Sequence, residues 1–140
     1  MSVFHYTHRV TYADCTVGNH IYHSRYLELL EAARGEFFRH LGKTFLEWQE
    51  EDTVFPVVEC RMRFKSPARY DELLKIEVRV TAAEGVRLSF RHRILHESGA
   101  AAVEAETSHV CTDLKDKPKR LPKELVERLG PYVLESPKAE

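Results

Sequence analysis

The period of the apolar residues changes along the chain, and this change restricts the fold more than any other sequence feature. Residues 3–12 alternate as in a half-buried strand. The residues expected on one face of that strand are Phe4, Tyr6, His8, Val10 and Tyr12. Residues 24–41 instead repeat every three or four positions and stop before Gly42, which predicts a helix of about five turns. Further alternating stretches follow at 55–65, 73–82, 86–97 and 101–113.

The order strand, helix, four strands predicts a two-layer α+β domain, because a sheet must bury its apolar face on the one long helix available. Two apolar faces are clear, and they consist of Val58, Cys60, Met62 and Phe64 in one stretch and of Leu74, Ile76, Val78 and Val80 in the next. The short turns hold Pro67, Gly85 and Gly99, which favours antiparallel hairpins. One helix does not fully cover five strands and an open sheet leaves an edge, so we expect a homodimer or homotetramer.

Length and charge narrow the functional class. The 140 residues suit a single domain, residues 1–140, and a net charge of −1 gives no general attraction to nucleic acid or to an anionic membrane. We expect a cytoplasmic protein, since neither a signal-peptide core nor 18 consecutive apolar residues occur. The odd number of cysteines predicts reduced thiols, with Cys60 and Cys111 in the core. Residues 121–140 read as a solvated tail with a short helix after Pro122.

The segment DCTVGNHIYHSRY, residues 14–26, concentrates chemically active side chains just before the predicted helix. The residues that carry a family resemblance are Asp14, His20, Ile21, Tyr22, His23, Tyr26, Glu31, Ala33 and Arg34, together with KSPARYDE at 65–72. In this pattern the chain resembles the hotdog-fold acyl-CoA thioesterases of the 4-hydroxybenzoyl-CoA thioesterase type. The resemblance implies a five-stranded antiparallel sheet wrapped around one long central helix. It also implies hydrolysis of acyl-CoA or acyl-carrier-protein thioesters without a cofactor or metal.

One departure from the family lies at the centre of the chemistry. The second acid of the family's Asp-x-Asp falls on Thr16, which is not a carboxylate. His20 is then the first choice as base, because an imidazole accepts a proton at cellular pH. It would activate water or deprotonate Thr16 to form an acyl-threonine, and water is favoured. By resemblance, the backbone N–H of His23 would polarise the thioester carbonyl, which suits its place at a helix N-terminus.

Several candidates have competing structural interpretations. Asp14 is either a base or a loop residue that caps backbone N–H groups, and Glu31 either reaches a partner's site or pairs with Arg34. For the His23 side chain, a packing or capping role is simpler than a catalytic one. The histidines elsewhere are most simply explained as residues of the strands. A zinc site from Cys15, His20 and His23 has at most three ligands, and Cys15 as a nucleophile has no evident base.

Substrate binding is expected of residues near the loop and in the 65–72 segment. These are Asn19, Tyr22, Tyr26, Lys65, Ser66 and Arg69. Either Lys65 with Arg69, or Arg87, Arg91 and Arg93 on one strand, would hold the phosphates of coenzyme A, unless these are ordinary surface charges. Two rival functions remain: a non-catalytic acyl-thioester binding protein, suggested by Thr16, and a hotdog dehydratase of 3-hydroxyacyl thioesters with His20 as base.

Overall fold

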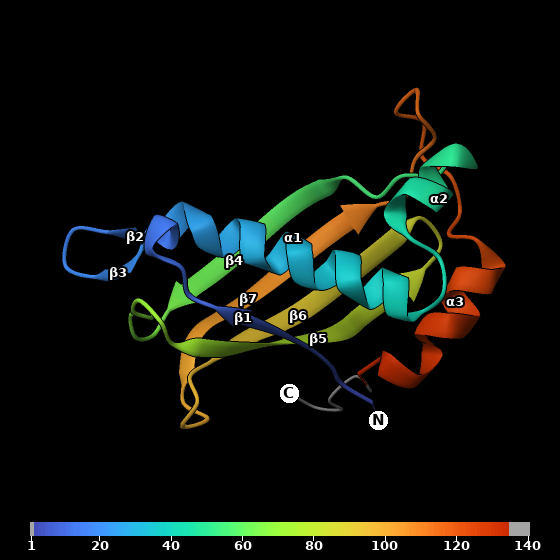
Figure 1. Ribbon diagram of the computed structural model, residues 1–140. Helices are drawn as coiled ribbons and strands as arrows, with labels where there is room; N and C mark the ends of the chain where they lie inside the picture. The colour runs from blue at the N-terminus through green and yellow to red at the C-terminus, as the bar shows by residue number, and fades with distance from the viewer. Residues whose placement is uncertain (1, 135–140) are drawn as a thin grey trace.

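The computed structural model describes residues 2–134, so the predicted tail is seen only as far as Leu134. The main sheet has the strand order β1–β5–β6–β7–β4, with every neighbouring pair antiparallel. Its strands are β1 (Phe4–Arg9), β4 (Val57–Phe64), β5 (Leu73–Glu84), β6 (Arg87–Leu95) and β7 (Ala101–Val110). Helix α1 (His23–His40) crosses one face of this sheet (Figure 1). The predicted hotdog architecture is therefore confirmed.

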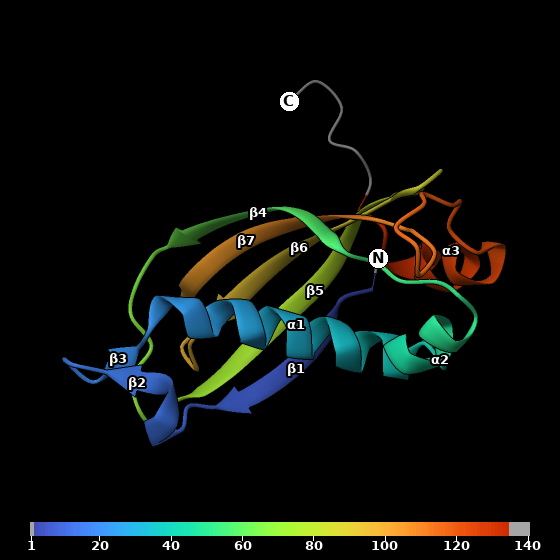
Figure 2. The ribbon, with the colours of Figure 1, turned by 90° about the horizontal axis from the view of Figure 1, so that it is seen from above.

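Helix α1 buries one stripe of its surface against the sheet (Figure 2). Phe37 is fully buried there, and its ring lies against the rings of Phe4, Phe90 and Tyr132. From the sheet side, the predicted apolar face of β5 is completely buried. After α1 ends, Gly42 adopts φ 103°, the left-handed conformation that favours glycine at a helix C-terminus, as its position in the sequence predicted.

The expected hairpin at Pro67 is wrong. β4 pairs with β7, at the edge of the sheet opposite β1, and the 65–72 segment carries the chain across the end of the sheet to β5. Gly85 and Gly99 do form the expected tight turns, at φ 60° and φ 93°. Alternation alone shows that a strand forms, but not which strand is its neighbour.

The expected burial of the β4 apolar face is also wrong. Val58 is 61% exposed, Phe64 is 56% exposed, and Cys60 is exposed as well. The cause is position, because α1 packs mainly against β1 and β5 and covers the edge strand β4 only in part, as where the Tyr26 ring lies 5.8 Å from the Phe64 ring. Cys111 is fully buried, as predicted.

Two short helical segments before β4 differ from the predictions. The first strand ends at Arg9, and Tyr12 begins the 3-10 turn η1 (Tyr12–Asp14) with an exposed side chain. Helix α2 (Phe45–Glu50) was not predicted; Thr44 caps it by accepting a hydrogen bond from the Glu47 N–H at 3.2 Å.

The tail is not simply solvated. The helix predicted after Pro122 forms as α3 (Lys123–Leu129), and Leu125 and Leu129 are buried against the core. Arg128 donates a hydrogen bond to the Leu41 carbonyl at the end of α1, at 2.9 Å. The 3-10 turn η2 (Gly130–Tyr132) follows. Within residues 2–134, no helix has the length and apolar character that crossing a membrane requires.

Candidate active site

The loop before α1 folds into a small hairpin of β2 (Cys15–Thr16) and β3 (His20–Ile21) at one end of the sheet (Figure 1). Thr16 and His20 are direct partners across this hairpin. Gly18 at φ 90° and Asn19 at φ 59° turn the chain, so two successive residues take left-handed conformations. The structure thus places Thr16, Asn19 and His20 together, with Thr16 and Asn19 exposed and His20 half-buried.

The His20 ring lies over Gly18. A Cβ atom at position 18 would come within 3.2 Å of the imidazole Nε2 and Cδ2 atoms. Apart from a 3.5 Å contact between Nδ1 and the Ile21 carbonyl, the described residues give this ring no polar partner. Its Nε2 atom therefore stays available for a proton.

Asp14 anchors the loop. Its buried carboxylate accepts hydrogen bonds from His8 Nε2 at 2.8 Å, from Arg25 Nη2 at 2.7 Å and from the Thr11 N–H at 2.8 Å. Burial raises the pKa of Asp14, but these hydrogen bonds outweigh it and hold the pKa well below its usual range. A carboxylate held in this way is a weak base. Neither His8 nor Arg25 was predicted as a partner of Asp14, because His8 lies on the preceding strand and Arg25 is an ordinary surface residue type within the 14–26 segment.

The first turn of α1 supplies free backbone donors. Tyr22 is the N-cap residue, and its own N–H donates to the Asp14 carbonyl at 3.0 Å. Among the described residues, the N–H groups of His23 and Ser24 have no acceptor. They lie at the positive end of the helix dipole, where an oxyanion is stabilised. The side chains of Tyr22 and His23 are exposed, with ring centroids 4.3 Å apart.

The 65–72 segment supports the loop from the side of the sheet. The Ile21 N–H donates to the Ala68 carbonyl at 2.9 Å, and Arg69 Nη1 donates to the Gly18 carbonyl at 3.0 Å. Tyr26 is buried, and its hydroxyl accepts the Ala68 N–H at 3.3 Å.

Two other residues of this segment contact the sheet instead of the loop. The ammonium of Lys65 lies 3.6 Å from the carboxylate of Glu104. The Ser66 hydroxyl lies 2.8 Å from His96 Nε2 and 3.0 Å from the Ala101 carbonyl. The contact with His96 was not expected from the sequence, in which the two residues are 30 positions apart.

Glu31 is not brought to the loop within one chain. It follows His23 by eight residues on α1, which is about 12 Å along the helix axis. It is exposed and lines a cavity between α1, α2 and the sheet, together with Arg34 and His109. No ion pair joins Glu31 to Arg34 in residues 2–134.

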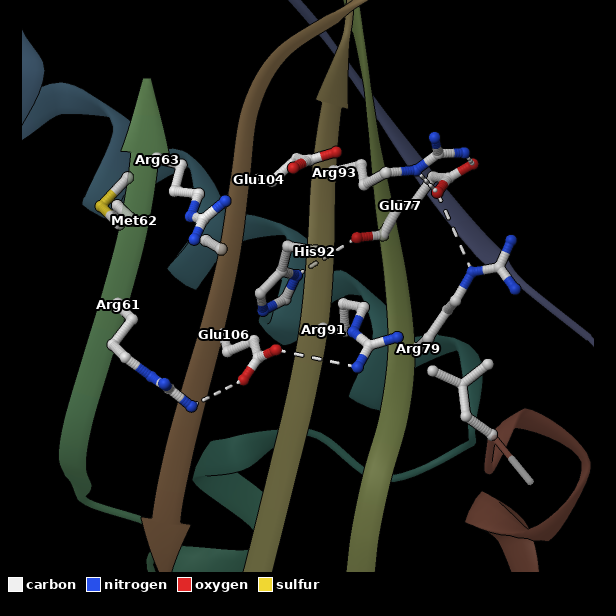
Figure 3. A pocket seen from close by; sticks show the side chains of 12 residues that line it. Arg61, Met62, Arg63, Glu77, Arg79, Arg91, His92, Arg93, Glu104 and Glu106 are labelled. Atoms are coloured by element: carbon white, nitrogen blue, oxygen red, sulfur yellow. Dashed lines mark hydrogen bonds and ion pairs between the residues drawn. The ribbon is translucent and has the colours of Figure 1, made fainter. Parts of the chain in front are cut away.

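Arg91 and Arg93 of β6 lie on the outer face of the sheet, away from α1, in a hollow that Figure 3 shows. Arg93 Nε lies 2.9 Å from Glu77, and Arg91 lies 3.7 Å from Glu106, which Arg61 also contacts at 3.0 Å. Alternating columns of arginine and glutamate thus pair with one another across the strands. This pairing favours the interpretation of Arg91 and Arg93 as surface charges over a phosphate site.

The metal and thiol alternatives gain no support from the geometry. Within the described part of the chain, no group of three or more His, Cys, Asp or Glu side chains is placed to hold a metal ion. Burial and the nearby Asp14 carboxylate raise the pKa of the Cys15 thiol. A thiol nucleophile requires the opposite shift.

Comparison with known proteins decides the family. Residues 10–129 match the model of the thioesterase-like superfamily. The chain belongs to this superfamily. It is 35% identical to the acyl-CoA thioester hydrolase YbgC of Escherichia coli over 89% of its own length and 94% of that protein. It is 33% identical to the acyl-CoA thioesterase YbgC of Haemophilus influenzae, over 87% and 90%.

A solved structure agrees with these sequence relatives. The probable thioesterase of Bartonella henselae is 31% identical and superimposes with a TM-score of 0.82, over 86% of this chain and all of that one. The family, the fold and the enzyme class expected from the sequence, a hotdog-fold thioester hydrolase, are thereby confirmed.

Proposed function

We propose that the chain hydrolyses acyl-CoA thioesters to a free acid and a thiol, with His20 as the base that activates water. The relatives named acyl-CoA thioester hydrolases support the substrate. The hydrogen bonds of Asp14 support the assignment of His20 as the base. The Asp14 carboxylate is buried among His8, Thr11 and Arg25, which leaves His20 as the proton acceptor of the loop. Acyl-carrier-protein thioesters remain a second possible substrate, and a cytoplasmic location stays a prediction of the sequence.

In the proposed reaction, His20 takes a proton from water as the water oxygen attacks the thioester carbonyl. The N–H groups of His23 and Ser24 stabilise the oxyanion that forms. The C–S bond then breaks, and the thiolate takes the proton from His20 and leaves as the free thiol, which restores the neutral imidazole. Thr16, across the hairpin from His20, holds the water in this scheme and is not acylated.

The same proposal includes a second copy of the chain. Strand β4 is an edge strand, and Cys60 and Phe64 are exposed on its apolar face. Pairing β4 with β4 of a second copy would satisfy its free backbone groups and cover this face. It would also place an exposed Glu31 near the partner's chain. Light scattering at micromolar concentration should give at least a dimer, and Phe64→Lys should weaken it, whereas Leu46→Lys, at an exposed position on α2, should not.

The deciding experiment is a panel of acyl-CoA thioesters with detection of the free thiol. His20→Ala should lower turnover by about two to four orders of magnitude with the fold and oligomer size kept. Thr16→Ala should have a mild effect if water is the nucleophile and a severe one if Thr16 is acylated. An unchanged rate in His20→Ala would refute the assignment of the base.

A rescue variant tests the geometry of the loop independently. Thr16→Asp restores the acid that the resembled family carries, next to His20 across the hairpin. The double variant Thr16→Asp with His20→Ala should regain turnover that His20→Ala has lost. Its acid limb should lie near the pH range of an ordinary carboxyl, about pH 4. A folded double variant that binds acyl-CoA but releases no thiol would show that residue 16 does not lie at the carbonyl.

The same panel separates the two rival functions. Loss of a 3-hydroxyacyl thioester without thiol release would identify a dehydratase. Saturable binding of acyl-CoA without either reaction would identify a binding protein, for which the absence of an acid at Thr16 is the supporting observation.

A further inference from the structure

Three side chains outside the loop form a hydrogen-bonded series of nucleophile, base and acid. Ser66 Oγ lies 2.8 Å from His96 Nε2, and His96 Nδ1 lies 2.6 Å from Glu72 Oε1. The second oxygen of Glu72 accepts the Arg69 N–H at 2.6 Å, which fixes the carboxylate. All three side chains are only partly buried. A hydroxyl paired to one imidazole nitrogen, with a carboxylate on the other, is the arrangement that activates a serine.

We propose that Ser66, His96 and Glu72 form a second acyl-transfer centre, which hydrolyses aryl esters and thioesters through an acyl-serine. This centre goes beyond the proposed water mechanism of the loop, because its nucleophile is a side chain and its base is His96. The two centres share one end of the sheet: the 65–72 segment carries Ser66 and Glu72 and also contacts β3 through Ala68.

The tautomer of His96 follows from its partners. With the proton of Nδ1 directed to Glu72, the lone pair of Nε2 faces the Ser66 hydroxyl. The hydroxyl has a second acceptor, the Ala101 carbonyl at 3.0 Å. When His96 is protonated, its Nε2–H donates to Ser66, and the hydroxyl turns to Ala101. When His96 is neutral, Ser66 donates to Nε2 and is ready to react.

The reaction balances without a cofactor. His96 Nε2 takes the hydroxyl proton as Ser66 Oγ bonds to the acyl carbon, and the bond from that carbon to the leaving oxygen or sulfur breaks. The leaving group takes the proton from His96. Water then attacks the acyl-serine, gives its proton to His96, and the C–O bond to Ser66 breaks, which releases the acid and restores the hydroxyl.

The substrate class follows from the backbone around Ser66. The N–H groups of Lys65 and Ser66 both donate to the Ala102 carbonyl, and residue 67 is proline. No backbone donor beside the nucleophile is therefore free for an oxyanion. Acyl donors must rely on a good leaving group, which aryl esters and thioesters have and amides lack.

The test is covalent labelling of the full-length protein with phenylmethylsulfonyl fluoride, followed by peptide mapping, and hydrolysis of p-nitrophenyl acetate. One sulfonyl group per chain should appear on Ser66. Ser66→Ala should lose the label, and His96→Ala should slow labelling and ester hydrolysis by about two to four orders of magnitude. Ser98→Ala removes an exposed hydroxyl two residues from His96 and is the matched control, which should label as the wild type does.

Glu72 acts through His96 and is a positioning residue, so its variant needs a separate readout. Glu72 is the charged side chain that pairs with His96 in residues 2–134. The Glu72 carboxylate orients the His96 ring, so Glu72→Gln should slow the labelling of Ser66, and Glu72→Asp, which keeps a carboxylate, should restore part of the labelling rate. A merely structural role for Glu72 would change thermal stability without this difference in labelling rate between the two variants.

A label that maps elsewhere, or a His96→Ala variant that labels at the wild-type rate, would overturn the proposal. If Ser66→Ala does not fold, Ser66→Cys keeps the test open, because a paired thiol at this position should be alkylated faster than the same thiol in a Ser66→Cys, His96→Ala protein. Thiol release from acyl-CoA without a Ser66 label would refute this centre alone. A Ser66 label together with an unchanged rate of thiol release in His20→Ala would refute the loop mechanism alone.

Discussion

Lowering the pH from 8 to 5 should destabilise the protein through two buried histidines. His92 on β6 is fully buried; its Nδ1–H donates to the Glu77 carbonyl at 3.2 Å, and Nε2 lies 3.5 Å from Arg34 Nη1. His109 on β7 donates to the Phe55 carbonyl at 2.9 Å. Burial lowers the pKa of His92 to about 3 and that of His109 to about 4, and the Arg34 charge adds to both shifts.

The sign and size follow from linkage. Both histidines are neutral in the folded protein, whereas an unfolded imidazole takes up a proton near pH 6.5. Their contribution to the free energy of unfolding is complete above pH 6.5 and is lost as the pH falls toward their pKa values in the folded protein. At pH 5 only the unfolded chain binds these protons. This lowers the free energy of unfolding by about 2 kcal/mol for each histidine, or about 4 kcal/mol together.

The assay is urea unfolding at pH 8 and pH 5 at one fixed protein concentration, because association also contributes to apparent stability. In the double variant His92→Asn with His109→Asn, each amide N–H can still donate to its carbonyl but does not titrate. The wild type should lose about 4 kcal/mol more than this variant between the two pH values. His40→Asn, at an exposed position, should behave as the wild type. Equal losses in the double variant and the wild type would refute the reasoning.

Three further substitutions test the loop and the core. Asp14→Asn should lower the free energy of unfolding by about 2 kcal/mol at neutral pH, measured by urea titration. Because the folded pKa of Asp14 is depressed, the difference in unfolding free energy between variant and wild type should shrink as the pH falls below about 4. Phe37→Ala should lower the free energy of unfolding by about 3 to 5 kcal/mol, since it leaves a cavity among four aromatic rings, and a smaller loss would show that the core collapses around it. Gly18→Ala should strain a residue at φ 90° and displace His20. The rate of thiol release should therefore fall by more than the loss of thermal stability accounts for. An unchanged rate would contradict the place given to His20.

The sheet and α1 were predictable because each has a strong local period. Leu74, Ile76, Val78 and Val80 alternate in the sequence and are fully buried in the structure. The pairing of β4 with β7 was not predictable, because alternation carries no information about neighbours distant in the sequence. The same limit explains the error at Cys60: its place on an apolar face was right, but whether anything covers that face depends on where β4 lies in the sheet.

Short elements with mixed charges were the hardest to predict. The charges along the segment of α3 alternate in sign, which predicted a solvated segment. Leu125 and Leu129 nevertheless lie four residues apart and share the face that becomes buried. α2 has only six residues, so its helical period spans less than two turns. Its recognisable signal was the capping pair of Thr44 and Glu47, which fits a capping box three residues apart.

The two candidate centres differ in what the sequence reveals of each. Thr16 and His20 lie within one short loop, so a contiguous motif points to both. Ser66 and His96 meet because the 65–72 segment crosses the end of the sheet where β6 gives way to the β6–β7 turn. Strict alternation would place His96 on the helix-facing side with His92 and Ile94, but the register shifts between Ile94 and Leu95 and the strand ends there. A serine and a histidine joined by a strand crossover and a register shift leave no periodic or local sequence signal, so the geometry of the fold is what connects them.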